Sequence, residues 1–331
     1  MFFTFNAILP VILTILVGYI LKTTKLLQEQ FFQQLNKLCF RCCLPVLLFY
    51  NVYNVNNLNQ IISYYKVCIF VVITIIIFYI IAFFFFMITI KDAKQKGVMI
   101  QCAFRSNYAI IGISLAISMT GENSIQVVIA SILSSISIPL FNVLAIISLS
   151  VFVNENNQKI SIVSILKKII TNPLILGVAS GFISLIIRQY IPRTPEGNLI
   201  FSIKNNLPFL YRTIQMLATC ASTIALIALG GNFTFKAISK LKNKIIVGVL
   251  TRTIICPSIC LTIAYLLGFN GPEFPALIAL FGSPVAVSSV PMTKEMGNDD
   301  ELAGQLVVWT SIASAFTLFF IIYVSRQFGI L

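Results

Sequence analysis

Long apolar runs alternate with short polar segments along the whole chain. A helix needs about 20 apolar residues to cross the hydrocarbon core of a bilayer, and the runs repeatedly reach that length. We therefore predict ten membrane-spanning helices. They lie at about 5–21, 35–54, 64–90, 98–118, 125–153, 169–191, 207–230, 245–267, 274–292 and 304–325. The first run is followed, not preceded, by lysines and lacks a small-residue cleavage site, so we expect a retained helix and not a signal peptide.

The composition supports an all-α integral membrane protein. Of the 331 residues, 58% are hydrophobic and 10% are charged, and the mean hydropathy is +0.95. Soluble domains carry about a quarter charged residues, so this chain lacks the polar surface that a water-exposed fold needs. The chain has no histidine, and its eight cysteines fall within or beside apolar runs. We interpret the cysteines as small fillers between helices, and we expect no metal and no cofactor.

The net charge of +13 is a signal of membrane topology and not of nucleic-acid binding. Most of the 23 basic residues lie in the loops that follow odd-numbered spans. Cytoplasmic loops of membrane proteins are enriched in lysine and arginine. We therefore expect the odd loops in the cytoplasm and both termini on the outer side.

The chain resembles itself in two places. Residues 10–20 and 173–183 share a proline, an Ile-Leu pair, a glycine, an aromatic residue and an isoleucine at the same spacing, so that Gly18 matches Gly181. Chance similarity among Ile- and Leu-rich helices is the alternative explanation. Each half holds five predicted spans, an odd number, so the second half must cross the membrane in the opposite direction. We expect two inverted repeats, residues 1–155 and 156–331, an architecture found in many secondary transporters. The polar linker NENNQK at 154–159 joins them.

The second match lies where two spans are interrupted. RSNYAIIGISLAISMTG (105–121) aligns with FGSPVAVSSVPMTKEMG (281–297), and Ser134-Ser135 then aligns with Thr310-Ser311 in the following span. Pro284 cannot donate a backbone hydrogen bond within a helix, and broken helices are tolerated only inside protein or beside water. Interrupted spans in matching positions of inverted halves indicate a substrate site near the membrane midplane.

The chemistry of that site favours an anion. Half-helix N-termini present free N–H groups and partial positive charge, whereas half-helix C-termini suit a cation or a neutral donor. Asn107 can donate and accept, and Ser283, Ser288 and Ser289 add hydroxyl groups. No aspartate or glutamate lies centrally in a span, which argues against a caged sodium ion and against a buried acid that relays protons.

Each singled-out polar residue also has a purely structural interpretation. Arg105 could hold substrate, snorkel to the interface or cap a neighbouring helix end. Arg41 and Arg252 lie within two or three turns of predicted cytoplasmic loops, which favours snorkelling. The serines of the fifth span, Ser135 among them, could simply allow close helix packing.

Four segments together resemble the auxin efflux carrier family, in particular its bacterial branch, which is related to the plant PIN proteins. They are LNKLCFRCCLPVLLFYNV (35–52), AFRSNYAIIGISLA (103–116), SPVAVSSVPMTKEMGND (283–299) and VVWTSIASAFTLFF in the last span. The resemblance covers essentially the whole chain. It implies ten helices in a fold like that of bile-acid sodium symporters and sodium–proton antiporters, with helices 4 and 9 broken and crossing. It also implies a scaffold of helices 1, 2, 6 and 7, a mobile unit of helices 3–5 and 8–10, an elevator-like motion, a bacterial inner membrane and possible homodimers through the scaffold.

The resemblance also implies small organic anions, such as carboxylates, as substrates. By position it puts the crossing at Asn107-Tyr108 and Pro284-Val285, although Ser114 stands where the family often has a proline. The candidate substrate-binding residues are therefore Arg105, Ser106, Asn107, Tyr108, Ser283, Pro284, Val285, Ser288 and Ser289, with Ser135 and Ser311 as a second tier.

We expect a secondary transporter or facilitator of an organic anion such as a dicarboxylate or an auxin-like aromatic acid, and no enzyme. The alternatives are a sodium- or proton-coupled symporter of the same fold and a membrane sensor that binds ligand without moving it. An intramembrane enzyme is disfavoured because it would need a Ser–Lys pair, and Lys294 lies at a predicted membrane edge.

Overall fold

The computed structural model describes residues 2–54, 64–108, 112–120, 124–152, 166–167, 170–193 and 199–330. The predicted linker at 154–159, and with it the boundary between the two predicted repeats, lies outside these residues. The described part of the chain is helical and contains no β-strand beyond two isolated β-bridges. The prediction of an all-α protein is therefore confirmed.

The first half of the chain forms these helices: α1 (Phe2–Thr23), α2 (Glu29–Leu38), η1 (Cys39–Cys43), α3 (Leu44–Tyr53), α5 (Tyr65–Thr89), α6 (Ala93–Phe104), α7 (Ile113–Thr120) and α8 (Ile125–Val151). The second half forms α10 (Pro173–Tyr190), α11 (Ile203–Asn206), α12 (Pro208–Asn232), α13 (Lys236–Leu250), η3 (Thr251–Ile255), α14 (Cys256–Leu266), α15 (Phe274–Gly282), α16 (Ser289–Glu295) and α17 (Asp300–Gln327). Both η segments are π-helical turns inside longer helices, so α2–η1–α3 and α13–η3–α14 are each continuous.

Seven of these helices, in the described residues, are long and apolar enough to cross a membrane. They are Glu29–Tyr53, Tyr65–Thr89, Ile125–Val151, Pro173–Tyr190, Pro208–Asn232, Lys236–Leu266 and Asp300–Gln327. The pairs α6/α7 and α15/α16 consist of shorter pieces, because the chain leaves the helical conformation between them. The number of spans and their inverted arrangement remain predictions.

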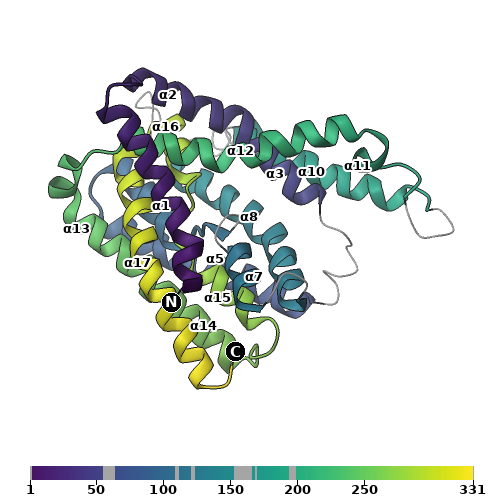
Figure 1. Ribbon diagram of the computed structural model, residues 1–331. Helices are drawn as coiled ribbons and strands as arrows, with labels where there is room; N and C mark the ends of the chain where they lie inside the picture. The colour runs from purple at the N-terminus through teal and green to yellow at the C-terminus, as the bar shows by residue number, and fades with distance from the viewer. Residues whose placement is uncertain are drawn as a thin grey trace.

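The helices form two groups (Figure 1). Helix α3 packs along α10 and α1 packs along α12, and in Figure 1 α3, α10 and α12 project together on one side. The larger group contains α5, α6 and α8 together with α13–α17. The chain segments in each group come from both halves of the sequence.

The two glycines that match in the predicted repeat lie at equivalent helix contacts. A Cβ on Gly18 of α1 would overlap the backbone carbonyl of Ile227 in α12. A Cβ on Gly181 of α10 would lie 2.8 Å from the Cβ of Val52 in α3. Each glycine therefore allows a helix of one half to approach a helix of the other half closely, as small residues do in bilayers.

The broken helices α6 and α15 lie in the interior of the larger group. Every residue of α15 is buried, and in α6 the buried stretch runs unbroken from Gly97 to Phe104. Exposed apolar side chains gather instead on long helices such as α5, where Ile73, Ile77 and Ile81 face outward. A broken helix in hydrocarbon leaves backbone groups without partners, so this burial is what the interruption requires.

Candidate functional site

The two interrupted segments cross each other as extended chain. Helix α6 ends at Phe104, and α15 ends at Gly282, where Ser283 has φ −65° and ψ 148°. Ser106 then forms an antiparallel β-bridge with Val285. Flanking it, the Asn107 N–H donates to the carbonyl of Pro284 over 2.8 Å, and the Ala286 N–H donates to that of Arg105 over 3.3 Å. These bonds satisfy backbone groups that the broken helices leave free.

The centre of the crossing differs slightly from the sequence-based position. The pairing places Ser106 opposite Val285, whereas the resemblance pointed to Asn107-Tyr108. The Tyr108 side chain is fully buried and its hydroxyl donates to the carbonyl of Ala276 in α15. Tyr108 therefore packs between the two broken helices. The difference arises because a family resemblance gives matching sequence positions but does not give the register in which two extended segments hydrogen-bond.

Arg252 lies at the same crossing, and the prediction that it snorkels to the cytoplasmic interface is wrong. Its side chain has no exposed surface. The guanidinium donates to carbonyls at the ends of both broken helices, among them those of Phe104 and Ser283. Arg41 differs: its side chain is 64% exposed and pairs with Glu295 at 3.4 Å.

Arg105 begins the extended segment after α6 and is 1% exposed. One terminal nitrogen, Nη2, donates to Asn142 Oδ1 at 2.7 Å and to Ser288 Oγ at 2.9 Å. The other, Nη1, lies 3.1 Å from Gln101 Oε1 and 3.0 Å from Met292 Sδ. All four partners are neutral, and no carboxylate in the described part of the chain pairs with this guanidinium.

The partners of Arg105 are themselves held by hydrogen bonds. The Asn142 amide donates to the Ile138 carbonyl one turn earlier in α8, which leaves its oxygen toward the arginine. The Gln101 amide donates to Thr293 Oγ1 in α16, so its oxygen likewise faces Arg105. The guanidinium is thus fixed in place by residues of α6, α8 and α16.

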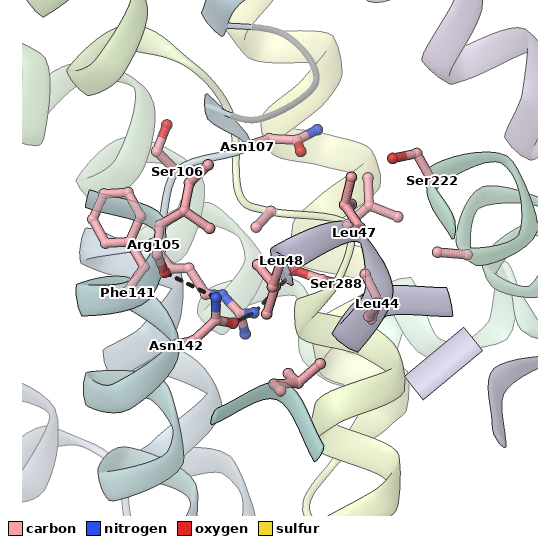
Figure 2. Close-up of a pocket in the computed structure, with 15 residues that line it drawn as sticks. Leu44, Leu47, Leu48, Arg105, Ser106, Asn107, Phe141, Asn142, Ser222 and Ser288 are labelled. Atoms are coloured by element: carbon pink, nitrogen blue, oxygen red, sulfur yellow. Dashed lines mark hydrogen bonds between the residues drawn. The ribbon is translucent and has the colours of Figure 1, made fainter. Parts of the chain in front are cut away.

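A cavity opens beside this network (Figure 2). Figure 2 shows Arg105, Asn142 and Ser288 gathered together, with Asn107 and Ser222 above them in the view. Its lining comes from both helix groups: Leu44, Leu47, Leu48, Arg105, Ser106, Asn107, Ile138, Phe141, Asn142, Leu174, Ser222, Ala225, Ala286, Val287 and Ser288. The volume open to the centre of a water-sized sphere is about 50 Å³. That is room for a few waters or a small polar group.

Two lining residues carry buried polar atoms that have no hydrogen-bond partner among the described residues. They are the Nδ2 of Asn107 and the Oγ of Ser106. Buried polar groups are nearly always hydrogen-bonded, so such atoms at a cavity wall indicate a polar occupant.

The candidate residues from the sequence divide into two sets. Arg105, Ser106, Asn107 and Ser288 line the cavity. The other candidates do not line it: Tyr108, Ser283, Pro284, Val285, Ser289, Ser135 and Ser311. The hydroxyls of Ser135 and Ser311 donate to carbonyls of their own helices, at Ile132 and Val307.

Sequence reasoning missed Asn142, Ser222 and the leucines of α3. Asn142 is an amide inside an apolar span, and that property alone could have marked it as a candidate. Nothing in the sequence placed Leu44 or Ser222 opposite the crossing, since both belong to other helices. Among the described residues, no group of three or more His, Cys, Asp or Glu side chains is placed to hold a metal ion.

A comparison with protein families gives a match over nearly the whole chain. Residues 3–322 match the family described as membrane transport protein, which contains the auxin efflux carriers. The chain belongs to this family. A comparison with curated proteins finds no match.

Family membership and the apolar helices together identify an integral membrane protein that acts as a transporter. It belongs to a transport family and not to a family of enzymes.

Proposed function

We propose that this chain is a secondary transporter or facilitator of a small organic anion, and that the anion's carboxylate binds in the cavity beside Arg105. The observation that carries the proposal is a buried guanidinium at a cavity wall whose partners in the described residues are all neutral. A buried charge without a counter-charge is costly, and a bound carboxylate supplies the opposite charge.

Other donors at the cavity suit the same ligand. The N–H₂ group of the Asn107 amide has no partner among the described residues, and the hydroxyls of Ser106 and Ser288 can each turn toward an acceptor. Hydrogen bonds from a charged donor to a carboxylate are about twice as strong as neutral ones. Arg105 therefore gives the main attraction, and the neutral donors orient the ligand.

The remaining wall is apolar and suits a hydrocarbon or aromatic body. It includes Leu44, Leu47, Phe141 and Ala225. The cavity volume of about 50 Å³ accommodates a carboxylate group but not a whole aromatic acid. Larger substrates therefore require the walls to separate. The walls come from α3, α10 and α12 on one side and from α8 and the crossing on the other. We therefore propose that the units to which these walls belong slide past each other in an elevator-type cycle.

The test is a thermal-shift titration of the purified protein with acetate, succinate, benzoate and indole-3-acetate. A bound ligand raises the melting temperature with concentration. We expect at least one carboxylate to do so and the Arg105→Gln variant to lose the response. The matched control is Arg212→Gln, which removes an exposed arginine and should leave the response unchanged.

Counterflow of the radiolabelled carboxylate into proteoliposomes then separates the competing functions. A transporter takes up the labelled carboxylate in exchange for unlabelled carboxylate loaded inside the vesicles, whereas a sensor binds the carboxylate without any counterflow. Counterflow that requires sodium or a proton gradient would instead favour a coupled symporter. If no carboxylate shifts the melting temperature, or if Arg105→Gln responds as the unmodified protein does, the proposal is wrong.

A further inference from the structure

The crossing brings together the C-terminal ends of two helices. The last carbonyls of a helix have no partner within it, and each C-terminus carries about half a unit of negative charge. Helices α6 and α15 both end here, at Phe104 and Gly282. Two buried ends therefore place about one unit of negative charge inside the protein. In many transporters with broken helices, such ends coordinate a coupling cation.

In this chain a protein side chain occupies the space between the two ends. Arg252 Nη1 donates to the carbonyls of Ala103 and Phe104 at 3.3 and 3.2 Å. Its Nη2 donates to those of Leu280 and Ser283 at 3.2 and 2.7 Å, and its Nε donates to Ser283 at 2.9 Å. All three guanidinium nitrogens thus donate to backbone carbonyls of the two broken helices.

The helix that carries Arg252 departs from regular α-helical geometry at this residue. Arg252 lies in the π-helical turn η3, between α13 and α14, and Pro257 follows near the start of α14. A π-turn inserts an extra residue into a helix and is frequent at functional sites. No carboxylate in the described part of the chain pairs with Arg252, so the helix ends are its only negative partners there.

We infer that Arg252 is a built-in cation of the transport site, which takes the place that a bound sodium ion would otherwise occupy between the ends of α6 and α15. The fixed charge neutralises both helix ends and repels a second cation. The crossing consequently keeps its shape without sodium, and the carrier moves its anion without a sodium partner at this position. Only the statement about anion transport rests on the proposed function, because sodium binding at the crossing can be measured without any substrate.

The first experiment measures the melting temperature of the purified unmodified protein in sodium chloride and in choline chloride at equal ionic strength. We expect the two values to agree within about 1 °C, because no sodium ion binds to the folded state. A saturable rise with sodium would overturn the inference.

The second experiment replaces the charge. Arg252→Ala should melt at least about 2 °C lower, and its melting temperature should now rise with sodium, because the vacated space exposes carbonyls to a small cation. Arg252→Lys keeps the charge and should stay close to the unmodified protein and indifferent to sodium. An Arg252→Ala protein as stable as the original in choline chloride would contradict the inference.

If Arg252→Ala fails to fold, the melting temperatures of Arg252→Lys and of the unmodified protein are compared in sodium chloride and in choline chloride instead. A lysine variant that becomes sodium-dependent, or an unmodified protein that binds sodium, overturns the inference. These measurements contain no carboxylate, so a failed anion proposal leaves their outcome unaffected. Where a carboxylate is transported, we further expect equal counterflow in sodium and choline media.

Discussion

Ser106 and Val285 lie opposite each other in an antiparallel β-bridge, although they come from opposite halves of the chain. This pairing fixes the backbone on both sides of the crossing, because Asn107 and Ala286 donate the flanking hydrogen bonds. It holds the Arg105 backbone at the edge of the cavity that its own side chain lines. Two broken helices thus stabilise each other where neither could be stable in lipid alone.

Asn107→Ala should weaken anion binding with little effect on the stability of the empty protein. The side-chain Nδ2 of Asn107 has no partner among the described residues, so its removal breaks no hydrogen bond seen for that atom. Loss of one ligand hydrogen bond, worth about 1–2 kcal/mol, corresponds to an affinity about 5- to 30-fold lower. Thermal-shift titration of the best carboxylate measures both the affinity and the melting temperature without ligand.

The matched control for Asn107 is Ser137→Ala. In the described part of the chain Ser137 Oγ is also buried without a partner, but Ser137 does not line the cavity. We expect the Ser137→Ala variant to bind the carboxylate with the same affinity as the unmodified protein. Equal losses of affinity in both variants would show that buried polar groups matter in general and that Asn107 has no specific role.

Gly18→Ala should destabilise the protein by forcing α1 away from α12. The new Cβ would overlap the carbonyl of Ile227, a backbone atom that cannot rotate away. Overpacking of a tight contact costs about 1–3 kcal/mol, so a drop of several degrees in melting temperature is expected. The control is Gly271→Ala, whose Cβ would meet only the flexible carboxylate of Glu273 at 3.2 Å, and a comparable drop there would refute the packing argument.

The distribution of basic residues predicts that the chain's last residue, Leu331, lies on the outer side of the membrane. Alkaline phosphatase fused after it should be active, and green fluorescent protein at the same position should be dark. Fusions truncated after Thr234, between α12 and α13, should give the opposite pair of signals, because that loop follows an odd-numbered span. Identical signals at the two positions would disprove the predicted topology.

The interruptions were predictable from the sequence, but their surroundings were not. Pro284 and the polar run that begins at Arg105 break apolar spans, and the structure leaves the helical conformation at both. A break in one span does not reveal which residues of other helices face it, and so Asn142 and Ser222 were missed. Arg252 was misinterpreted because its distance along the chain from a cytoplasmic loop gives its depth, but not the direction in which its side chain points.

The ion pair between Arg41 and Glu295 gives a direct test of relative motion between the two proposed units. Arg41 belongs to η1 next to α3, Glu295 is the last residue of α16, the helix that follows the crossing, and their charged atoms are 3.4 Å apart. Arg41 is largely exposed and Glu295 is partly exposed. A surface pair of this kind contributes only about 0–1 kcal/mol, so it can open during a cycle. In a background that lacks the two cysteines that are not buried, Cys42 and Cys220, the pair can be replaced by Arg41→Cys and Glu295→Cys.

A short bifunctional thiol reagent then links the two units. We expect cross-linking to stop carboxylate counterflow while the thermal shift by the same carboxylate persists, because binding needs no sliding and transport does. The control replaces the ion pair of Lys294 and Asp300, 3.2 Å apart, which joins α16 to the start of α17 within one unit. Its cross-link should leave counterflow unchanged. Undiminished counterflow through the Arg41–Glu295 cross-link would mean that transport proceeds without displacement at this boundary, and the elevator proposal would have to be abandoned.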